Sequence, residues 1–437
     1  MYRKFSKVLE KWDQHHEKPL MIIGARQVGK TWLIQDFCRE HYHDYLYLNF
    51  EETPEINTIF DGSLKPEDLL RKMSIFLGQR IDSSMALVFD EIQKCERAIT
   101  SLKYFCESEK DYRVIAAGSL LGVKLQRFES SFPVGKVSLE KMQPMDFEEF
   151  LLACGDELLR DAIFEAFEKK EFLIEGIHNK ALRLYHDYLF TGGMPEVVQE
   201  YIEAERNIYS MQEGVLKNLQ LAYLADMTKY TLSAAEGAKI VEVYQSIPRQ
   251  LAKENPKFKY TDIRPYANRR DFSGALEWLE SSGMIYRINR VEMPEHPLKG
   301  YEENSNFKIY LSDVGILTNA CGLHYKDLLP DQPNMYKGAV IENYVVQQLF
   351  AQDIKLYYYK PSEKMEIDLI FEDKDGNIIP AEIKSGRRKR STSLNNYMDK
   401  YNAEYAIRFS ELNFGYTNNI FSVPLYATWC IKPVRSI

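Results

Sequence analysis

The chain has 437 residues, of which 45% are hydrophobic and 13% aromatic, and its formal net charge is −8. This length suits about three domains, and the supply of apolar side chains excludes a largely disordered chain. The acidic balance argues against a uniform coat of nucleic acid, so only local basic patches remain as candidate DNA contacts.

The first 150 residues predict a parallel α/β domain. An amphipathic helix comes first, with Tyr2, Phe5 and Trp12 on its apolar face. Strands are expected at about residues 20–23, 45–50, 85–89 and 113–117, separated by helical stretches.

A glycine-rich loop follows the first strand directly. The loop comprises Gly24, Ala25, Arg26, Gln27, Val28, Gly29, Lys30 and Thr31, and an amphipathic stretch follows it. In a strand–loop–helix context, backbone N–H groups wrap an anion, Lys30 reaches the β- and γ-phosphates, and the Thr31 hydroxyl can ligate Mg²⁺. A plain glycine turn would leave the Gly-Lys-Thr sequence unexplained. We therefore predict ATP and Mg²⁺ as cofactors.

Two later strands bring polar groups to the same sheet. The apolar run from Met85 ends in Asp90, expected to hold Mg²⁺ through water, and Glu91, expected to polarise the attacking water. The next strand ends in Ser119, placed to sense the γ-phosphate or the water because ligands lie at the carboxyl ends of such strands. Ordinary turn chemistry explains Ser119 equally well.

The middle of the chain predicts two further segments. Residues 151–235 are helical in pattern and suggest a lid or linker bundle. Residues 236–325 show helix, short helix, helix and two β-like runs, which is the order of a winged helix. Arg269 and Arg270 precede the third helix and are candidate nucleic-acid contacts. The alternative is that this helix packs on the ATPase domain.

The last segment, residues 326–437, carries a second chemistry. Two β-like runs flank the turn sequence Lys374-Asp375-Gly376-Asn377, so Asp368 should fall opposite Glu382 within a residue or two. Facing carboxylates repel each other unless a cation lies between them, and a divalent metal is the usual one. We therefore expect Asp368 and Glu382 to be metal ligands.

The spacing Asp-x(13)-Glu-x-Lys is the nuclease signature of the restriction-endonuclease-like fold. Lys384 would steady the attacking water or the phosphate, and Glu342 on the preceding helix would be an accessory acid. The alternative is a hairpin whose charged face is merely solvated. The basic run that begins with Arg387 and Arg388 could hold phosphates, although a solvated loop explains it equally well.

Cysteine spacing and apolar stretches indicate the compartment in which the protein is expected. The six cysteines lie far apart without a C-x-x-C pair, so they suggest neither a zinc site nor a disulfide framework. No stretch approaches the roughly 20 apolar residues of a membrane helix, and the N-terminus lacks a signal-peptide core. We expect a soluble cytoplasmic protein without a membrane partner.

Together these motifs resemble a prokaryotic family of AAA-type P-loop ATPases with a C-terminal region of unknown function. Further elements of the likeness are Pro144–Phe150, Gly192–Glu196 and Lys308–Gly315. The resemblance implies ATP binding, slow hydrolysis, a winged helix and a nuclease-like tail in a nucleotide-gated switch. Where the family tends to carry Gly-Arg, this chain has Gly135-Lys136, and a lysine lacks the bidentate fork of an arginine.

We interpret the sequence as an ATPase whose nucleotide state controls a winged-helix and nuclease-like half that acts on DNA. The rival is a nucleotide-gated protein-interaction switch that keeps the nuclease fold as a scaffold. The facing carboxylates beside a lysine favour the first, and the acidic pI of about 5.7 favours the second. The partner and the oligomeric state stay open, including a homo-oligomer.

Overall fold

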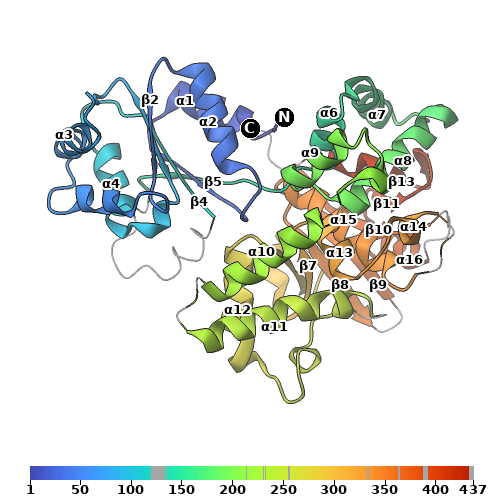
Figure 1. The fold of residues 1–437 in the computed structure, drawn as a ribbon. Helices are drawn as coiled ribbons and strands as arrows, with labels where there is room; N and C mark the ends of the chain where they lie inside the picture. Colours follow the sequence, from blue (N-terminus) through green and yellow to red (C-terminus); the bar gives the residue numbers. More distant parts are fainter. Residues whose placement is uncertain are drawn as a thin grey trace. The chain divides into compact units, whose positions relative to one another are not determined.

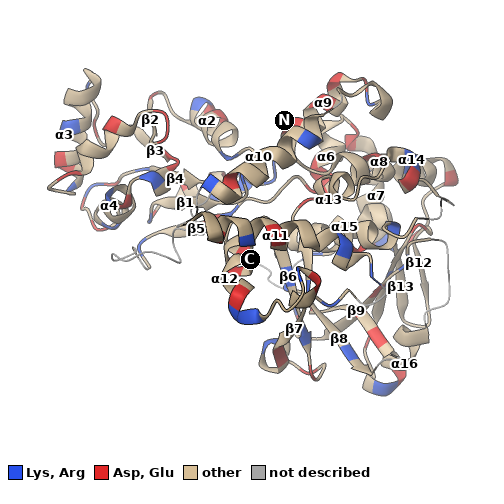
Figure 2. Cartoon of the chain, turned by 60° about the horizontal axis from the view of Figure 1, so that its bottom comes forward, with Lys and Arg blue, Asp and Glu red and all other residues tan. Residues whose placement is uncertain are grey.

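The computed structural model describes residues 1–119, 133, 135–212, 214–229, 231, 233–253, 256–330, 332, 334–362, 365–386 and 392–432. The chain forms two compact units, one of residues 1–143 with 281–283 and one of residues 144–280 with 284–437 (Figure 1). Basic and acidic residues are interspersed over the elements of both units (Figure 2). None of the helices in the described ranges is long and apolar enough to cross a membrane.

The first unit is built on a five-stranded sheet of order β2-β3-β4-β1-β5. Its strands are β1 (Leu20–Ile23), β2 (Tyr45–Asn49), β3 (Ala86–Asp90), β4 (Val114–Gly118) and β5 (Ser138–Lys141). All pairings between these strands are parallel. Its helical elements are α1 (Ser6–His15), α2 (Lys30–His41), η1 (Pro54–Phe60), α3 (Pro66–Leu77), η2 (Ile92–Lys94) and α4 (Glu96–Cys106). The parallel α/β prediction is confirmed.

Strand β5 is the one strand of this sheet that the sequence did not predict. It pairs with β1 at the edge of the sheet, and its residues are exposed or half-buried. An edge strand with so little apolar surface lacks the buried run that marked the other four. By contrast, every residue of β3 is buried, as expected for a parallel strand covered on both faces.

The second unit begins with helices, and further helices lie between and after its strands. They are α6 (Phe147–Ala153), α7 (Glu157–Lys169), α8 (Glu175–Thr191), α9 (Pro195–Glu203), η3 (Ile208–Ser210), α10 (Val215–Lys229), α11 (Ala234–Leu251), η4 (Tyr260–Asp262), α12 (Arg269–Ser281), η5 (Leu298–Tyr301), α13 (Val314–Ala320), α14 (Tyr325–Leu328), α15 (Lys337–Ala351), α16 (Thr392–Tyr401) and η6 (Leu425–Cys430). Helix α8 packs against α13, α14 and η6, so the segment expected as a lid or linker is packed into this unit.

An eight-stranded sheet of order β12-β13-β11-β10-β9-β8-β6-β7 runs through the second unit. Its strands are β6 (Ile285–Val291), β7 (Glu302–Leu311), β8 (Tyr357–Ser362), β9 (Met365–Glu372), β10 (Ile378–Ile383), β11 (Ala406–Ser410), β12 (Gly415–Thr417) and β13 (Ile420–Pro424). The antiparallel pair β6–β7 is the hairpin expected for a winged helix, but β6 also pairs in parallel with β8. The hairpin is therefore part of a larger sheet.

Three elements of the family likeness meet in one buried node. The Met145 N–H donates to Gly193 O at 2.8 Å, and the Gly193 N–H donates to Asp313 Oδ2 at 2.7 Å. A Cβ atom on Gly193 would lie 1.9 Å from the carbonyl oxygen of Met145, so this close approach requires glycine. Gln347 Nε2 also donates to Asp313, at 3.3 Å. Burial raises the pKa of Asp313 to about 6.

Candidate functional site

The glycine-rich loop between β1 and α2 has the backbone of an anion-binding turn. Gly24 has a φ of +153°, and a Cβ atom there would lie 2.3 Å from the carbonyl oxygen of Met142. Gly29 has a φ of 92° and Gln27 one of 63°, both in the left-handed region. Helix α2 begins at Lys30, so its free N–H groups point into the loop. The loop therefore has a backbone that can wrap a phosphate.

Lys30 lies buried inside this loop. Its Nζ donates to the carbonyl oxygens of Gly24 at 3.0 Å and Ala25 at 2.8 Å. Burial lowers the pKa of the amine to about 8, against the opposing effect of the Glu91 and Asp90 carboxylates, while nearby Arg26 lowers it further. An ammonium group held this way is available to phosphate oxygens in the same loop.

Thr31 and Asp90, the two predicted magnesium residues, are in direct contact. Thr31 Oγ1 donates to Asp90 Oδ2 at 2.6 Å, which joins the start of α2 to the end of β3. Tyr47 on β2 donates to the same carboxylate oxygen at 2.8 Å. Hydroxyl and carboxylate oxygens suit Mg²⁺, so this pair fits the ion. The sequence pattern gave no sign of this contact, because the alternating neighbours of Tyr47 indicated only a strand.

Glu91 follows β3 with a φ of 51°, which turns its side chain out of the strand direction. Its Oε2 accepts from Ser119 Oγ at 3.2 Å and from Gln93 Nε2. The structure thus brings together the predicted water-activating acid and the predicted sensing residue. Lys136, the departure from the family pattern, forms an ion pair with Glu107 at 3.1 Å.

The second candidate site lies on the β9–β10 hairpin. The register of the hairpin ends with Ala381 opposite Leu369, and Glu382 and Asp368 are the next residues of the two strands. Asp368 Oδ2 accepts the N–H of Ile383 at 2.8 Å, and Lys384 Nζ donates to Glu382 Oε1 at 2.5 Å. The two acids and the lysine are therefore neighbours.

Two observations indicate that a cation fits between these acids. Glu382 is 7% exposed, and its Oε2 is buried without a hydrogen-bond partner. Burial raises the pKa of Asp368 to about 7, reinforced by the Glu342 and Glu382 carboxylates and opposed by Lys308. A divalent ion would satisfy the orphaned oxygen and hold both groups ionised. Within the described residues, no group of three or more His, Cys, Asp or Glu side chains has a metal-binding arrangement.

A lysine that the sequence pattern did not single out as a site residue lies among these acids. Lys308 on β7 is buried, and its Nζ lies 3.1 Å from Glu342 Oε1 and 3.0 Å from Glu366 Oε1. Tyr310 on the same strand donates to Glu342 Oε1 at 2.6 Å. Lys360 Nζ lies 3.1 Å from the other oxygen of Glu366. The only signal was the spacing of Lys308 and Tyr310 on one face of a strand.

The predicted nucleic-acid contacts are placed in part. Arg269 and Arg270 are exposed and form the first turn of α12, rather than preceding it. Arg387 and Arg388 lie outside the described residues.

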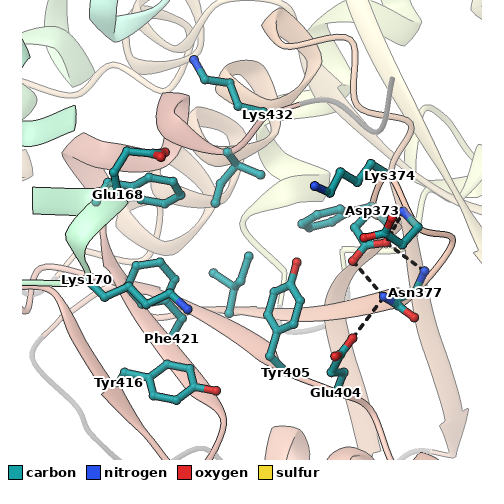
Figure 3. Close-up of a pocket in the computed structure, with 15 residues that line it drawn as sticks. Glu168, Lys170, Asp373, Lys374, Asn377, Glu404, Tyr405, Tyr416, Phe421 and Lys432 are labelled. Atoms are coloured by element: carbon teal, nitrogen blue, oxygen red, sulfur yellow. Dashed lines mark hydrogen bonds between the residues drawn. The ribbon is translucent and has the colours of Figure 1, made fainter. Parts of the chain in front are cut away.

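A separate cavity of about 610 Å³ opens at the turn end of the β9–β10 hairpin (Figure 3). Asn377 Nδ2 bridges Asp373 at 3.2 Å and Glu404 at 3.1 Å on one wall. Lys170 Nζ lies 5.0 Å from the centre of the Tyr416 ring on another. The rim carries both lysines and acids, so its charge selects no single class of ligand.

Three segments of the chain match known family models. Residues 16–151 match a family model described as an AAA domain. Over these residues the first unit is similar to an AAA domain. Residues 182–327 and 337–427 match two models that are each described as a domain of unknown function, DUF8612 and DUF4143. No curated protein matches the chain.

Several solved structures are similar to the chain at low identity. The Walker-type ATPase PABY2304 of Pyrococcus abyssi is 15% identical with a TM-score of 0.45, over 73% of this chain and 95% of that one. The Aeropyrum pernix ORC1 protein, solved in complex with DNA, is 13% identical with a TM-score of 0.30, over 74% and 93%. AMPPCP-bound DnaA from Aquifex aeolicus is 12% identical with a TM-score of 0.29, over 64% and 88%.

Proposed function

We propose that the AAA domain binds ATP with Mg²⁺ and hydrolyses it, and that its nucleotide state controls the second unit. The contact between Thr31 Oγ1 and Asp90 Oδ2 carries the proposal, because it brings the loop and the acidic strand to one point. When bound, Mg²⁺ would neutralise charge on the β- and γ-phosphates. The loop N–H groups and Lys30 hold the phosphates, and Glu91 takes a proton from the attacking water while Ser119 orients its carboxylate.

Glu91→Gln is expected to preserve ATP binding and lose turnover. The amide keeps the size of the side chain but cannot accept a proton from water, and general-base catalysis contributes about 100-fold or more to such a rate. Phosphate release and binding of a fluorescent ATP analogue, measured on the same preparation, test this. Gln93→Ala is the matched control, because it removes the neighbouring donor but leaves the carboxylate. A Glu91→Gln protein with wild-type turnover would remove Glu91 from the mechanism.

For the second unit we propose metal-dependent cleavage of DNA. The orphaned Glu382 oxygen beside Asp368 carries this proposal, since it provides a place for a divalent ion. The order α15, antiparallel β8-β9-β10, α16 and a parallel β11 supports the nuclease-like interpretation. Asp368 and Glu382 would hold Mg²⁺ or Mn²⁺, which polarises the phosphodiester, and Lys384 would stabilise its developing charge. Arg269 and Arg270 are the proposed DNA contacts of this unit.

Asp368→Ala in the full chain is expected to lose both Mn²⁺ binding and nicking of supercoiled plasmid. Lys384→Ala is expected to keep the metal and lose nicking, because the lysine acts on the phosphate rather than on the ion. Calorimetric titration and a plasmid assay with and without ATP measure both. Asp375→Ala, an exposed acid in the same hairpin, is the control. Equal Mn²⁺ binding by wild type and Asp368→Ala, with no cutting by either, would contradict the nuclease proposal.

That outcome would favour a second function, a nucleotide-gated protein-interaction switch. Its supporting observation is that Lys308 and Lys360 already form ion pairs with Glu342 and Glu366. A site neutralised by its own lysines can persist as a scaffold. The two proposals differ in one measurable property, which is the metal affinity of the Asp368–Glu382 pair.

A further inference from the structure

The acidic cluster of the second unit contains a cation supplied by the chain itself. The side chain of Lys308 is 2% exposed, and its ammonium group lies between Glu342 and Glu366, at 3.1 Å and 3.0 Å. It also lies 5.1 Å from the centre of the Tyr358 ring. The carboxylates raise the pKa of Lys308 well above its ordinary value despite the opposing effect of burial, so the amine stays charged.

We propose that Lys308 takes the place of a second divalent ion, so that the cluster holds one metal, at Asp368 and Glu382. This inference rests on the metal site of the proposed function and adds its stoichiometry. It also gives Glu342 a role other than that of the accessory acid predicted from the sequence. Glu342 Oε1 is engaged by Lys308 and by the Tyr310 hydroxyl, so it anchors the lysine.

The charges of the described residues support a single ion. Four carboxylates, from Glu342, Glu366, Asp368 and Glu382, are set against the ammonium groups of Lys308, Lys360 and Lys384 and the guanidinium group of Arg408, which pairs with Glu382 across β10 and β11. These charges balance, so one divalent ion would leave the cluster with two positive charges and a second ion would raise the excess to four, which favours a single ion. Removing Lys308 would leave two of the carboxylates short of a cation, and buried carboxylates without a counter-ion are strongly unfavourable.

The residues around the proposed metal site come from two different segments of the chain. Lys308 and Tyr310 come from β7, within the segment that matches one family of unknown function, whereas Glu342, Asp368 and Glu382 come from the segment that matches the other. The β6–β7 hairpin is thus a structural component of the proposed metal site. Residues 326–437 alone would lack it.

The test is calorimetric titration of the nucleotide-free full chain with Mn²⁺, with Asp368→Ala as the background for ions bound elsewhere. Above that background, wild type is expected to bind one Mn²⁺ and Lys308→Met two. Lys360→Met is the matched control, because it removes the other partner of Glu366, and Lys308→Arg keeps the charge. Both are expected to bind one Mn²⁺.

Thermal unfolding gives a second readout. Lys308→Met is expected to unfold at a lower temperature than wild type. Mn²⁺ is expected to raise the unfolding temperature of Lys308→Met by more than it raises that of wild type or of Lys360→Met. If Lys308→Met is unfolded without metal, Mn²⁺ should refold it. A folded Lys308→Met with wild-type stoichiometry and affinity, or an unfolded one that Mn²⁺ does not refold, would overturn the inference. Wild type indistinguishable from Asp368→Ala would instead overturn the metal site.

Discussion

Lys30→Met is expected to weaken ATP binding at least about 100-fold without destabilising the AAA domain. The ammonium group supplies the charge that meets the phosphates, and losing a buried charged contact costs about 3 kcal/mol or more in binding. Keeping that charge buried also has a cost to folding. The pKa of Lys30 is about 8 instead of 10.5, so the buried charge costs about 3 kcal/mol near neutral pH.

The sign of this linkage can be measured. Below pH 8 the folded protein carries the charged amine and the full cost applies, whereas between pH 8 and 10.5 the folded amine loses its proton and the cost disappears. Lys30→Met loses two hydrogen bonds to carbonyl oxygens but also the cost of the buried charge, so its unfolding free energy at pH 7 should match or exceed that of wild type. This advantage should disappear as the pH rises. Nucleotide titration and denaturant unfolding measure the two effects, with exposed Lys11→Met as control. Normal ATP binding by Lys30→Met would refute the site.

Gly193→Ala is expected to lower the unfolding free energy of the second unit by about 3 kcal/mol or more. The added methyl group would lie 1.9 Å from Met145 O and 2.8 Å from the Tyr188 hydroxyl. Both are fixed, since the backbone of Met145 hydrogen-bonds to Gly193 and Tyr188 is fully buried. Relief would pull the Gly193 N–H away from the buried carboxylate of Asp313.

Calorimetric unfolding with and without an ATP analogue measures this effect. The unfolding transition that shifts to higher temperature with the nucleotide belongs to the AAA domain, and its temperature should be unchanged in Gly193→Ala. The other transition should occur at a lower temperature than in wild type. Gly176→Ala in α8 is the control, because a Cβ atom there meets nothing within 4 Å and alanine favours a helix. Equal unfolding temperatures for wild type and Gly193→Ala would contradict the conclusion that the close approach of Gly193 to Met145 requires glycine.

The features that could be predicted from the sequence are those encoded by residues close together in the chain. The glycine-rich loop, the buried β3 run and the hairpin turn each depend on neighbours in the chain, so the four strands and the β9–β10 hairpin were accessible from sequence. The contacts of Tyr47 with Asp90 and of Lys308 with Glu342 join residues 43 and 34 positions apart. No local periodicity encodes which strands become neighbours, and the node at Gly193 was visible only as unexplained motifs.

The parallel pairing of β6 with β8 has a consequence for the independence of the two segments of unknown function. Residues 289–291 of β6 pair with residues 357–359 of β8, so the boundary between the segments crosses the interior of one sheet. Cutting the chain there would turn an interior strand into an open edge with unpaired N–H and C=O groups, and such an edge pairs readily with another copy. Separated, the two segments would be exposed to self-association, which the intact chain avoids by pairing them with each other.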